Sequence, residues 1–136
     1  MEVRMDLSRI LIQDGSEHQV IFLRERNGEA ESAREFPIVI GDPEALAIDR
    51  RLKGYKKARP MTHDLMAEII TRLNAELEKI VINDLKDQTF YAKLVLRLNG
   101  EVVEVDSRPS DAIALGVASE TPIYVNEKVL DEVCRQ

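Results

Sequence analysis

Several protein classes are excluded by what this sequence lacks. One cysteine, Cys134, occurs among the 136 residues, so the chain cannot form a disulfide within itself. No apolar run approaches the length of a membrane-spanning helix. The start of the chain carries charges where a signal peptide requires an apolar segment. We therefore expect a cytoplasmic protein with no membrane partner.

The common motifs of catalytic and nucleotide-binding sites are also missing. There is no dinucleotide fingerprint, Walker loop, nucleophile elbow or H-E-x-x-H pattern. With only two histidines and one cysteine, a zinc site built from nitrogen and sulfur ligands is disfavoured. The carboxylates that remain as candidates are Asp49, Asp64, Asp84, Asp106 and Asp111. Oxygen ligands suit Mg²⁺ or Mn²⁺, and such ions can assist phosphodiester hydrolysis.

The composition is that of an ordinary soluble globular domain. Hydrophobic residues make up 44% of the chain and charged residues 32%. This length supports one core, so we expect a single domain over residues 1–136. The formal net charge of −6 argues against a constitutive nucleic-acid binder. It still allows a local basic patch or a metal-assisted contact with phosphate.

Residues 105–125 predict the end of a strand, a polar turn, a helix and another strand. The helix is apolar on every face over residues 112–118, which predicts that it lies in the middle of the domain. Ser107, Ser110 and Asp111 are residue types that cap such a helix. Alternatively, Arg108 with Asp106 and Asp111 forms a site for an anionic ligand or a metal-held phosphate at the positive end of the helix dipole. The sequence leaves both interpretations open.

The first part of the chain predicts three strands and a helix. Alternation over residues 2–13, then apolar runs at 20–23 and 36–41, indicate the strands. Asp42-Pro43-Glu44 begins a helix that Gly54 ends. Six cations lie between residues 50 and 59, across the end of this helix, and Tyr55 lies among them. They fit either a solvated helix end or a surface that binds a phosphate backbone, with Tyr55 stacking on a base.

The second part predicts another helix, a β-meander and a closing segment. Thr62 is the expected N-cap of a helix whose apolar residues at 65, 66, 69, 70, 73 and 77 face the core, which leaves His63 exposed near its N-terminal end. Strands are expected at 78–84, 89–98, 101–106 and 122–125, and a short helix from Asn126 to Val133. The fold class is therefore α+β: an antiparallel or mixed sheet in meanders, with three to four packed helices that include one buried central helix.

Several segments, taken in order, resemble the bifunctional nuclease domain family. The most specific are Asp106-Ser-Arg-Pro-Ser-Asp-Ala-Ile-Ala-Leu115 and Arg59-Pro-Met-Thr-His-Asp-Leu65. Further matches lie at residues 37–41, 44–48, 82–92, 122–125 and 129–130. The resemblance covers nearly the whole chain. It implies a non-specific nuclease that cleaves DNA and RNA with a divalent metal, and a homo-oligomer, in particular a dimer.

The resemblance also assigns candidate site residues. His63, Asp64 and Asp111 are the implied catalytic residues, with His63 as general base or acid. Asp111, with Asp106 or Asp64, would hold Mg²⁺ or Mn²⁺. The implied substrate-binding residues are Lys56, Lys57, Arg59, Thr62, Arg108 and Ser110, with Glu44 as a weaker member of the motif set. Arg108 would hold a phosphate.

A non-catalytic explanation accounts for the same residues. In it, the serines and Asp111 cap a buried helix and Arg108 pairs with a neighbouring acid. The chain would then be a homo-oligomeric module that binds a protein or a small anionic ligand. Carboxylates clustered near His63 would favour the enzyme. Motif side chains that bond only to each other, with no open cleft, would favour the module.

Overall fold

The computed structural model describes residues 1–26, 31–55 and 58–134. Its strands are β1 (Glu2–Leu11), β2 (His18–Glu25), β3 (Glu35–Gly41), β4 (Ala75–Lys86), β5 (Thr89–Leu98), β6 (Glu101–Ser107) and β7 (Ile123–Asn126). Its helices are α1 (Asp42–Lys53), α2 (Thr62–Arg72), α3 (Pro109–Gly116) and α4 (Glu127–Val133), and a 3₁₀ turn, η1 (Val117–Ser119), follows α3. The expected α+β class is confirmed.

One mixed sheet of seven strands organises the chain, in the order β3-β2-β1-β7-β4-β5-β6. Two antiparallel meanders, β1 to β3 and β4 to β6, form its halves. The short strand β7 joins them, since it runs antiparallel to β1 and parallel to β4. The two halves of the sequence therefore share one sheet and one core.

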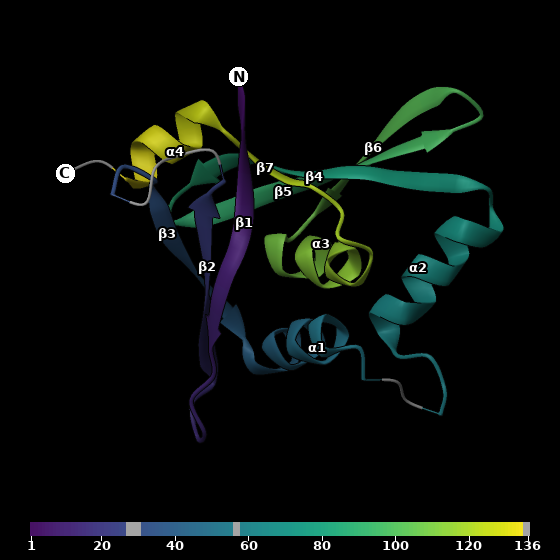
Figure 1. Cartoon of the computed structure of the whole chain (residues 1–136), viewed down its shortest axis with the longest axis horizontal. Helices are drawn as coiled ribbons and strands as arrows, with labels where there is room; N and C mark the ends of the chain where they lie inside the picture. The colour runs from purple at the N-terminus through teal and green to yellow at the C-terminus, as the bar shows by residue number, and fades with distance from the viewer. Residues whose placement is uncertain (27–30, 56–57, 135–136) are drawn as a thin grey trace.

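The sheet curves around α3, which lies in the middle of the molecule with α1 below it and α2 beside it (Figure 1). Phe36 of β3 and Phe90 of β5 stack with ring centroids 5.6 Å apart, although their strands are far apart in the sheet order. At Gly116 an added Cβ would lie 2.6 Å from Cδ1 of Ile80. Glycine therefore leaves room for the Ile80 side chain where α3 ends against β4.

The prediction of a buried central helix is confirmed, because every residue of α3 except Asp111 is buried. The predicted capping is wrong. Arg108 is the N-cap residue of α3, and no side chain forms a capping hydrogen bond there. The hydroxyl of Ser107 instead donates to the Arg108 carbonyl at 2.8 Å. Asp111 is thus available for the contacts described below.

The predictions for α2 require four corrections. The N-cap is Met61 rather than Thr62, and the helix ends at Arg72 because Asn74 adopts a positive φ of 61°, so Leu77 lies in β4. The predicted core face is wrong in part, because Leu65, Ile69 and Leu73 are 51%, 49% and 64% exposed. His63, predicted to be exposed, is buried at 8% exposure.

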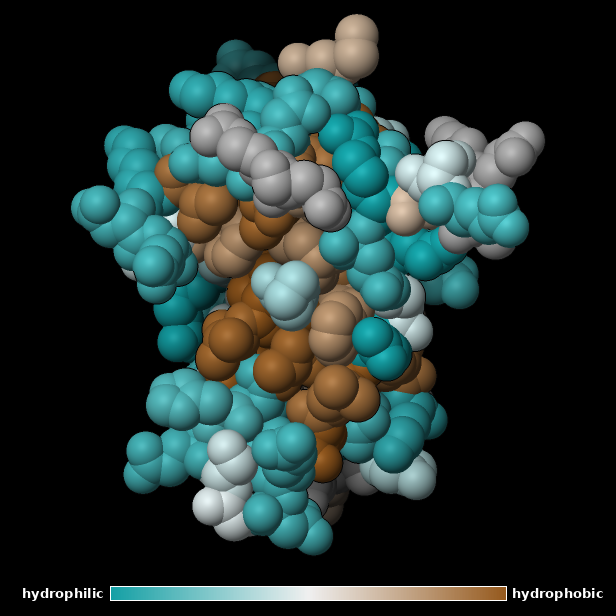
Figure 2. Space-filling view, turned by 90° about the vertical axis from the view of Figure 1, so that its left-hand side faces the viewer, coloured by the Kyte–Doolittle hydropathy of each residue, from teal (hydrophilic) through white to brown (hydrophobic). Residues whose placement is uncertain are grey.

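Apolar side chains are also exposed on the β3 side of the molecule, where they gather across the middle of the face in Figure 2. Val39 of β3 and Leu11 at the end of β1 are exposed there, and both pair with Val20 of β2 in the sheet register. Among the described residues, this area and the α2 residues above are therefore two of the places where apolar side chains are exposed. Among the described residues, no helix is long and apolar enough to cross a membrane.

Candidate functional site

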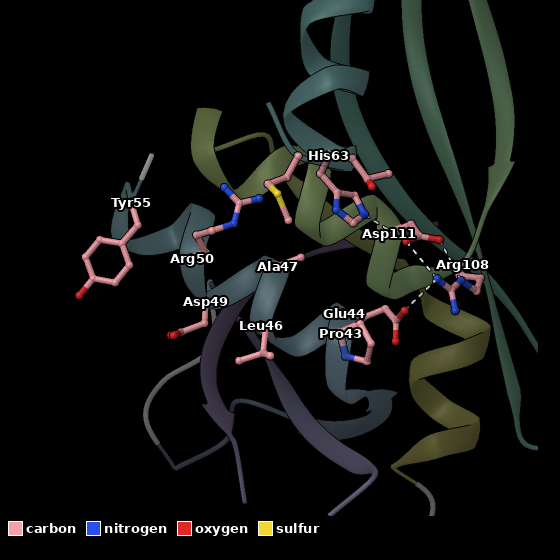
Figure 3. Close-up of a pocket in the computed structure, with 12 residues that line it drawn as sticks. Pro43, Glu44, Leu46, Ala47, Asp49, Arg50, Tyr55, His63, Arg108 and Asp111 are labelled. Carbon is pink, nitrogen blue, oxygen red and sulfur yellow. Dashed lines mark hydrogen bonds and ion pairs between the residues drawn. The ribbon is translucent and has the colours of Figure 1, made fainter. Parts of the chain in front are cut away.

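A cleft of about 810 Å³ opens between α1 and the first residues of α2 and α3. Its charged end contains His63, Arg108, Asp111 and Glu44, which point toward one another in Figure 3. These residues come from three helices that the curved sheet holds together. The cleft therefore collects side chains from both halves of the sequence.

His63 and Asp111 form the first contact of the site. His63 Nε2 lies 3.1 Å from Asp111 Oδ1, and both side chains line the cleft. Because an ionised carboxylate can only accept, Nε2 must carry a proton in this pair. In a neutral imidazole the lone pair then lies on Nδ1, which has no hydrogen-bond partner among the described residues. This arrangement is suited to accepting a proton from a bound molecule.

Arg108 lies on the other side of Asp111. Its Nε donates to Asp111 Oδ2 at 2.8 Å and its Nη2 donates to Oδ1 at 3.1 Å. Nη2 also reaches Glu44 Oε2 at 3.4 Å. Gly41 makes room for this carboxylate, because a Cβ at that position would lie 2.1 Å from Glu44 Oε1. Arg108 is largely exposed, so its remaining donors can reach a ligand in the cleft.

These contacts fix the charges of the site. Burial alone would raise the pKa of Asp111, but the hydrogen bonds from Arg108 and His63 have the larger combined effect and hold that pKa below its ordinary value. The hydrogen bond to Asp111 raises the pKa of Arg108. With His63 neutral, Arg108, Asp111 and Glu44 together carry a formal charge of −1. This charge weakens the attraction of the site for a phosphate.

Asp64, the neighbour of His63, makes a different set of contacts. It accepts a hydrogen bond from Arg50 Nη1 at 3.1 Å, another from Arg51, and a third from the Met61 backbone N–H at 3.0 Å. Arg51 also donates to the carbonyls of Ala114 and Leu115, at 2.6 and 2.9 Å. Asp64 therefore ties α1 to α2, and Arg51 extends the link to the C-terminal end of α3.

The remaining predicted residues are spread around the cleft. Thr62 lines it, whereas Ser110 is buried and lines a neighbouring cavity of about 600 Å³. Arg59 is exposed in the segment between α1 and α2, and Asp106 is exposed on β6. Lys56 and Lys57 lie outside the described residues. The structure thus brings together His63, Asp111 and Arg108, with Thr62 and Glu44 beside them.

The described side chains do not form a ready-made binding site for the expected metal ion. No three His, Cys, Asp or Glu residues in this part of the chain are placed to hold an ion. The three predicted ligands lie in different surroundings: Asp64 is bound by arginines, Asp111 by Arg108 and His63, and Asp106 is exposed. A requirement for Mg²⁺ or Mn²⁺ stays a prediction.

Sequence reasoning missed several residues of the cleft. Leu46, Ala47 and Met61 form apolar parts of its wall. Outside the cleft, Arg51 donates to the Ala114 carbonyl of α3. The sequence could have indicated this wall, because four residues of α1 are spaced by three and four positions and so share one helix face: Pro43, Leu46, Ala47 and Arg50. Ala45 and Ile48 of α1 face the core, whereas Leu46 and Ala47 face this cleft.

Comparisons with known proteins agree with this sequence and fold. Residues 21–136 match the bifunctional nuclease domain. A Mycobacterium tuberculosis protein described as uncharacterized is 40% identical over 121 residues, which are 89% of this chain and 70% of that protein. Bifunctional nuclease 1 of Oryza sativa subsp. indica is 24% identical over 121 residues, 87% of this chain and 36% of its own length. Bifunctional nuclease 1 of Arabidopsis thaliana is 25% identical over 119 residues, 85% of this chain and 36% of its own length. The chain belongs to the bifunctional nuclease domain family.

Proposed function

We propose that this chain hydrolyses phosphodiester bonds of DNA and RNA in the cleft between α1, α2 and α3. The observation that carries the proposal is the arrangement of His63, Asp111 and Arg108, in which one carboxylate orients an imidazole and a guanidinium. A histidine oriented in this way can act as a general base, and a guanidinium can bind phosphate oxygens. Family membership and the plant relatives named bifunctional nucleases support the same activity.

In this proposal His63 Nδ1 accepts a proton from water as the water oxygen attacks the phosphorus. The bond to the leaving sugar oxygen breaks, and that oxygen takes a proton from solvent. Arg108 holds the non-bridging oxygens with the donors that Asp111 and Glu44 leave free. Asp111 keeps the imidazole in the required tautomer.

A requirement for Mg²⁺ or Mn²⁺ is the finer part of the proposal. The formal negative charge of the described site opposes phosphate binding, and a divalent cation would offset it. The protein side chains alone do not provide a complete ligand set, so no step above depends on the ion. The cleavage assay therefore includes both ions and a chelator.

The experiment compares cleavage of end-labelled single-stranded DNA and RNA by wild type, His63→Ala and Asp111→Asn. All proteins are purified identically and checked for folding. His18→Ala is the matched control, because His18 is the other histidine and is exposed at the start of β2. Activity that is lost in both folded site variants and kept in His18→Ala supports the proposal. Equal activity in every variant would assign the cleavage to another site or to a contaminant.

We propose as a second function that the chain is a homodimeric binding module. The exposed apolar residues Leu65 and Ile69 on α2 and Leu73 at its C-cap favour this candidate, because isolated soluble domains rarely expose such a stripe without a partner. The two functions are compatible, since the stripe and the charged end of the cleft lie on different parts of α2. The mass of the native protein in solution tests the dimer.

A further inference from the structure

One wall of the cleft is apolar, although the charged end alone would serve to hold a phosphate. Pro43, Leu46 and Ala47 lie three and four residues apart, so they project from the same face of α1 into the cleft (Figure 3). Leu46 is 52% exposed, although burying a leucine is worth about 1.5–3 kcal/mol. This side chain is therefore available to a ligand.

Met61 and Tyr55 extend this apolar part of the cleft. Met61 precedes α2 and is half exposed, and Tyr55 follows Gly54, which ends α1 with a positive φ of 75°. Tyr55 lies at the opposite end of the cleft from Arg108 in Figure 3. The cleft thus has a guanidinium and an imidazole at one end and the Tyr55 ring, beside the charged Asp49 and Arg50, at the other, with apolar Leu46 and Ala47 between them.

The size of the cleft fits a small organic group beside a phosphate. Its volume of about 810 Å³ lies within the range of roughly 300–1,000 Å³ found for small-molecule sites. A nucleotide fits these surroundings, because it joins an anionic phosphate, which Arg108 can bind, to a flat base whose apolar face can lie on the apolar wall. Apolar and aromatic side chains bind any base by stacking, without reading its hydrogen-bonding edge.

The charges around the cleft argue against binding to a duplex backbone. Glu44 and Asp49 line it, Arg50 is paired with Asp64, and the whole chain carries −6. Proteins that bind duplex DNA non-specifically obtain most of their affinity from contacts between several cations and phosphates. No such row lies among the described residues of this cleft, whereas its apolar and aromatic side chains are suited to contact with a base.

We propose that the cleft takes one unpaired nucleotide, with its phosphate at Arg108 and its base against Leu46 and Met61, toward Tyr55. This inference rests on the proposed nuclease function and names its substrate class, which is single-stranded nucleic acid. A base within a duplex is covered on both faces by its neighbours and cannot enter the cleft without unstacking, which costs a few kcal/mol.

The first test uses three end-labelled substrates: a single strand, the same strand annealed to its complement, and the single strand with abasic nucleotides at its centre. Cleavage of the single strand is expected to fall by about tenfold or more in the duplex and at the abasic positions. Equal cleavage of all three substrates would overturn the base site and leave the nuclease function standing. If nothing is cleaved, the nuclease function fails. The anisotropy of the labelled strands in chelator then still tests the base site, which requires tighter binding of the normal strand than of the abasic strand.

The second test changes the cleft itself. Leu46→Ser and Tyr55→Ala are expected to raise KM for the single strand by roughly tenfold each, while kcat changes little. Leu52→Ser and Tyr91→Ala are the matched controls, because Leu52 is 52% exposed on the same helix and Tyr91 is exposed on β5, both outside the cleft. Unchanged KM in both cleft variants would overturn the proposal. Tyr55→Phe keeps the ring and is expected to keep the wild-type KM.

Discussion

His63 Nε2 of α2 lies 3.1 Å from Asp111 Oδ1 of α3, a contact between residues separated by 48 positions in the sequence. The contact fixes which nitrogen of His63 carries the proton, because Asp111 remains ionised beside Arg108. The same carboxylate therefore serves two residues with different expected roles. Its replacement should affect proton transfer and phosphate binding together.

We predict that Asp111→Asn lowers the cleavage rate by about 100-fold or more while the protein stays folded, which is the range for loss of a positioned general base. An asparagine has nearly the same shape, but its amide can turn its NH₂ group toward Nε2 and favour the other tautomer of His63. Single-turnover cleavage measures the rate, and circular dichroism checks the fold. Retention of the rate within about threefold would remove Asp111 from the mechanism.

Asp6→Asn is the control for this substitution. Asp6 is exposed and lies 3.9 Å from the exposed Arg26, so the contact contributes little. The Asp6→Asn substitution changes the net charge of the chain by the same amount as Asp111→Asn. A similar loss of cleavage in both variants would indicate an effect of overall charge rather than of the site.

Asp64→Asn is expected to act on stability. It removes the carboxylate that pairs with the buried side chain of Arg51, which also holds the α3 carbonyls of Ala114 and Leu115. A buried charged donor that loses its partner typically costs about 2 kcal/mol. We predict a decrease of this size in the free energy of unfolding at neutral pH, measured by urea denaturation. An unchanged midpoint and slope would show that the arginines find other partners.

The pH dependence of stability should change in the same variant. Burial alone would raise the pKa of Asp64, but hydrogen bonds from the Met61 N–H, Arg51 and Arg50 lower it by more, so it lies below the ordinary value. The folded state therefore binds fewer protons than the unfolded state near the unfolded pKa of about 3.9. The contribution of Asp64 is present above that pH and is lost as the pH falls through it toward the folded pKa. We predict a flatter loss of stability between about pH 5 and pH 3 in Asp64→Asn than in wild type.

The sequence predicts the order of the elements because their signals are local. Pro43, Gly54 and the apolar α3 segment mark the helices, and alternating or apolar runs mark the strands. The end of α2 was missed because Leu73 and Leu77 continue the helical spacing, whereas the backbone leaves the helix at Asn74. Asparagine tolerates that conformation, but it does not require it.

The site was predicted less completely than the fold. His63, Asp111 and Arg108 were candidates from the sequence, but their mutual contacts depend on how α2 and α3 pack. The burial of His63 also depends on how α2 and α3 pack, so the sequence did not predict it. Asp64 lies next to His63 in the sequence and yet turns toward Arg51, because neighbouring residues project from a helix about 100° apart. Adjacency in the motif therefore did not imply a shared role.

A substitution at Gly116 tests how the central helix α3 packs on the sheet. A Cβ there would lie 2.6 Å from Ile80 Cδ1 and 3.0 Å from Thr121 Cβ, and Ile80 is fully buried. We predict that Gly116→Ala lowers the free energy of unfolding by about 1–3 kcal/mol through overpacking. Ala118→Val is the control, because Ala118 is exposed just after α3 and should tolerate a larger side chain.

The double variant Gly116→Ala with Ile80→Val tests whether Ile80 Cδ1 is the atom that clashes with the new methyl group. Ile80→Val removes Cδ1, the atom nearest to the new methyl group, and alone costs about 0.5–1.5 kcal/mol through the lost burial. If the clash is with Cδ1, the double variant should be more stable than the sum of the two single effects predicts. Additive losses in urea denaturation would place the strain elsewhere, for example at Thr121.

The apolar stripe on α2 should be a dimer contact. Leu65, Ile69 and Leu73 follow one another at intervals of four residues and are each about half exposed or more. The β3 side is a weaker candidate, because Pro37 interrupts the hydrogen-bonding edge of β3 and Arg9 covers the ring of Phe22 at 4.0 Å. We predict that the wild-type chain is a dimer at micromolar concentration and that Ile69→Glu makes it a monomer, because two glutamates would be buried without partners. Light scattering after size exclusion measures the mass. Val39→Glu on the β3 side is the matched control and should remain a dimer, so a monomeric Val39→Glu with a dimeric Ile69→Glu would move the interface to β3.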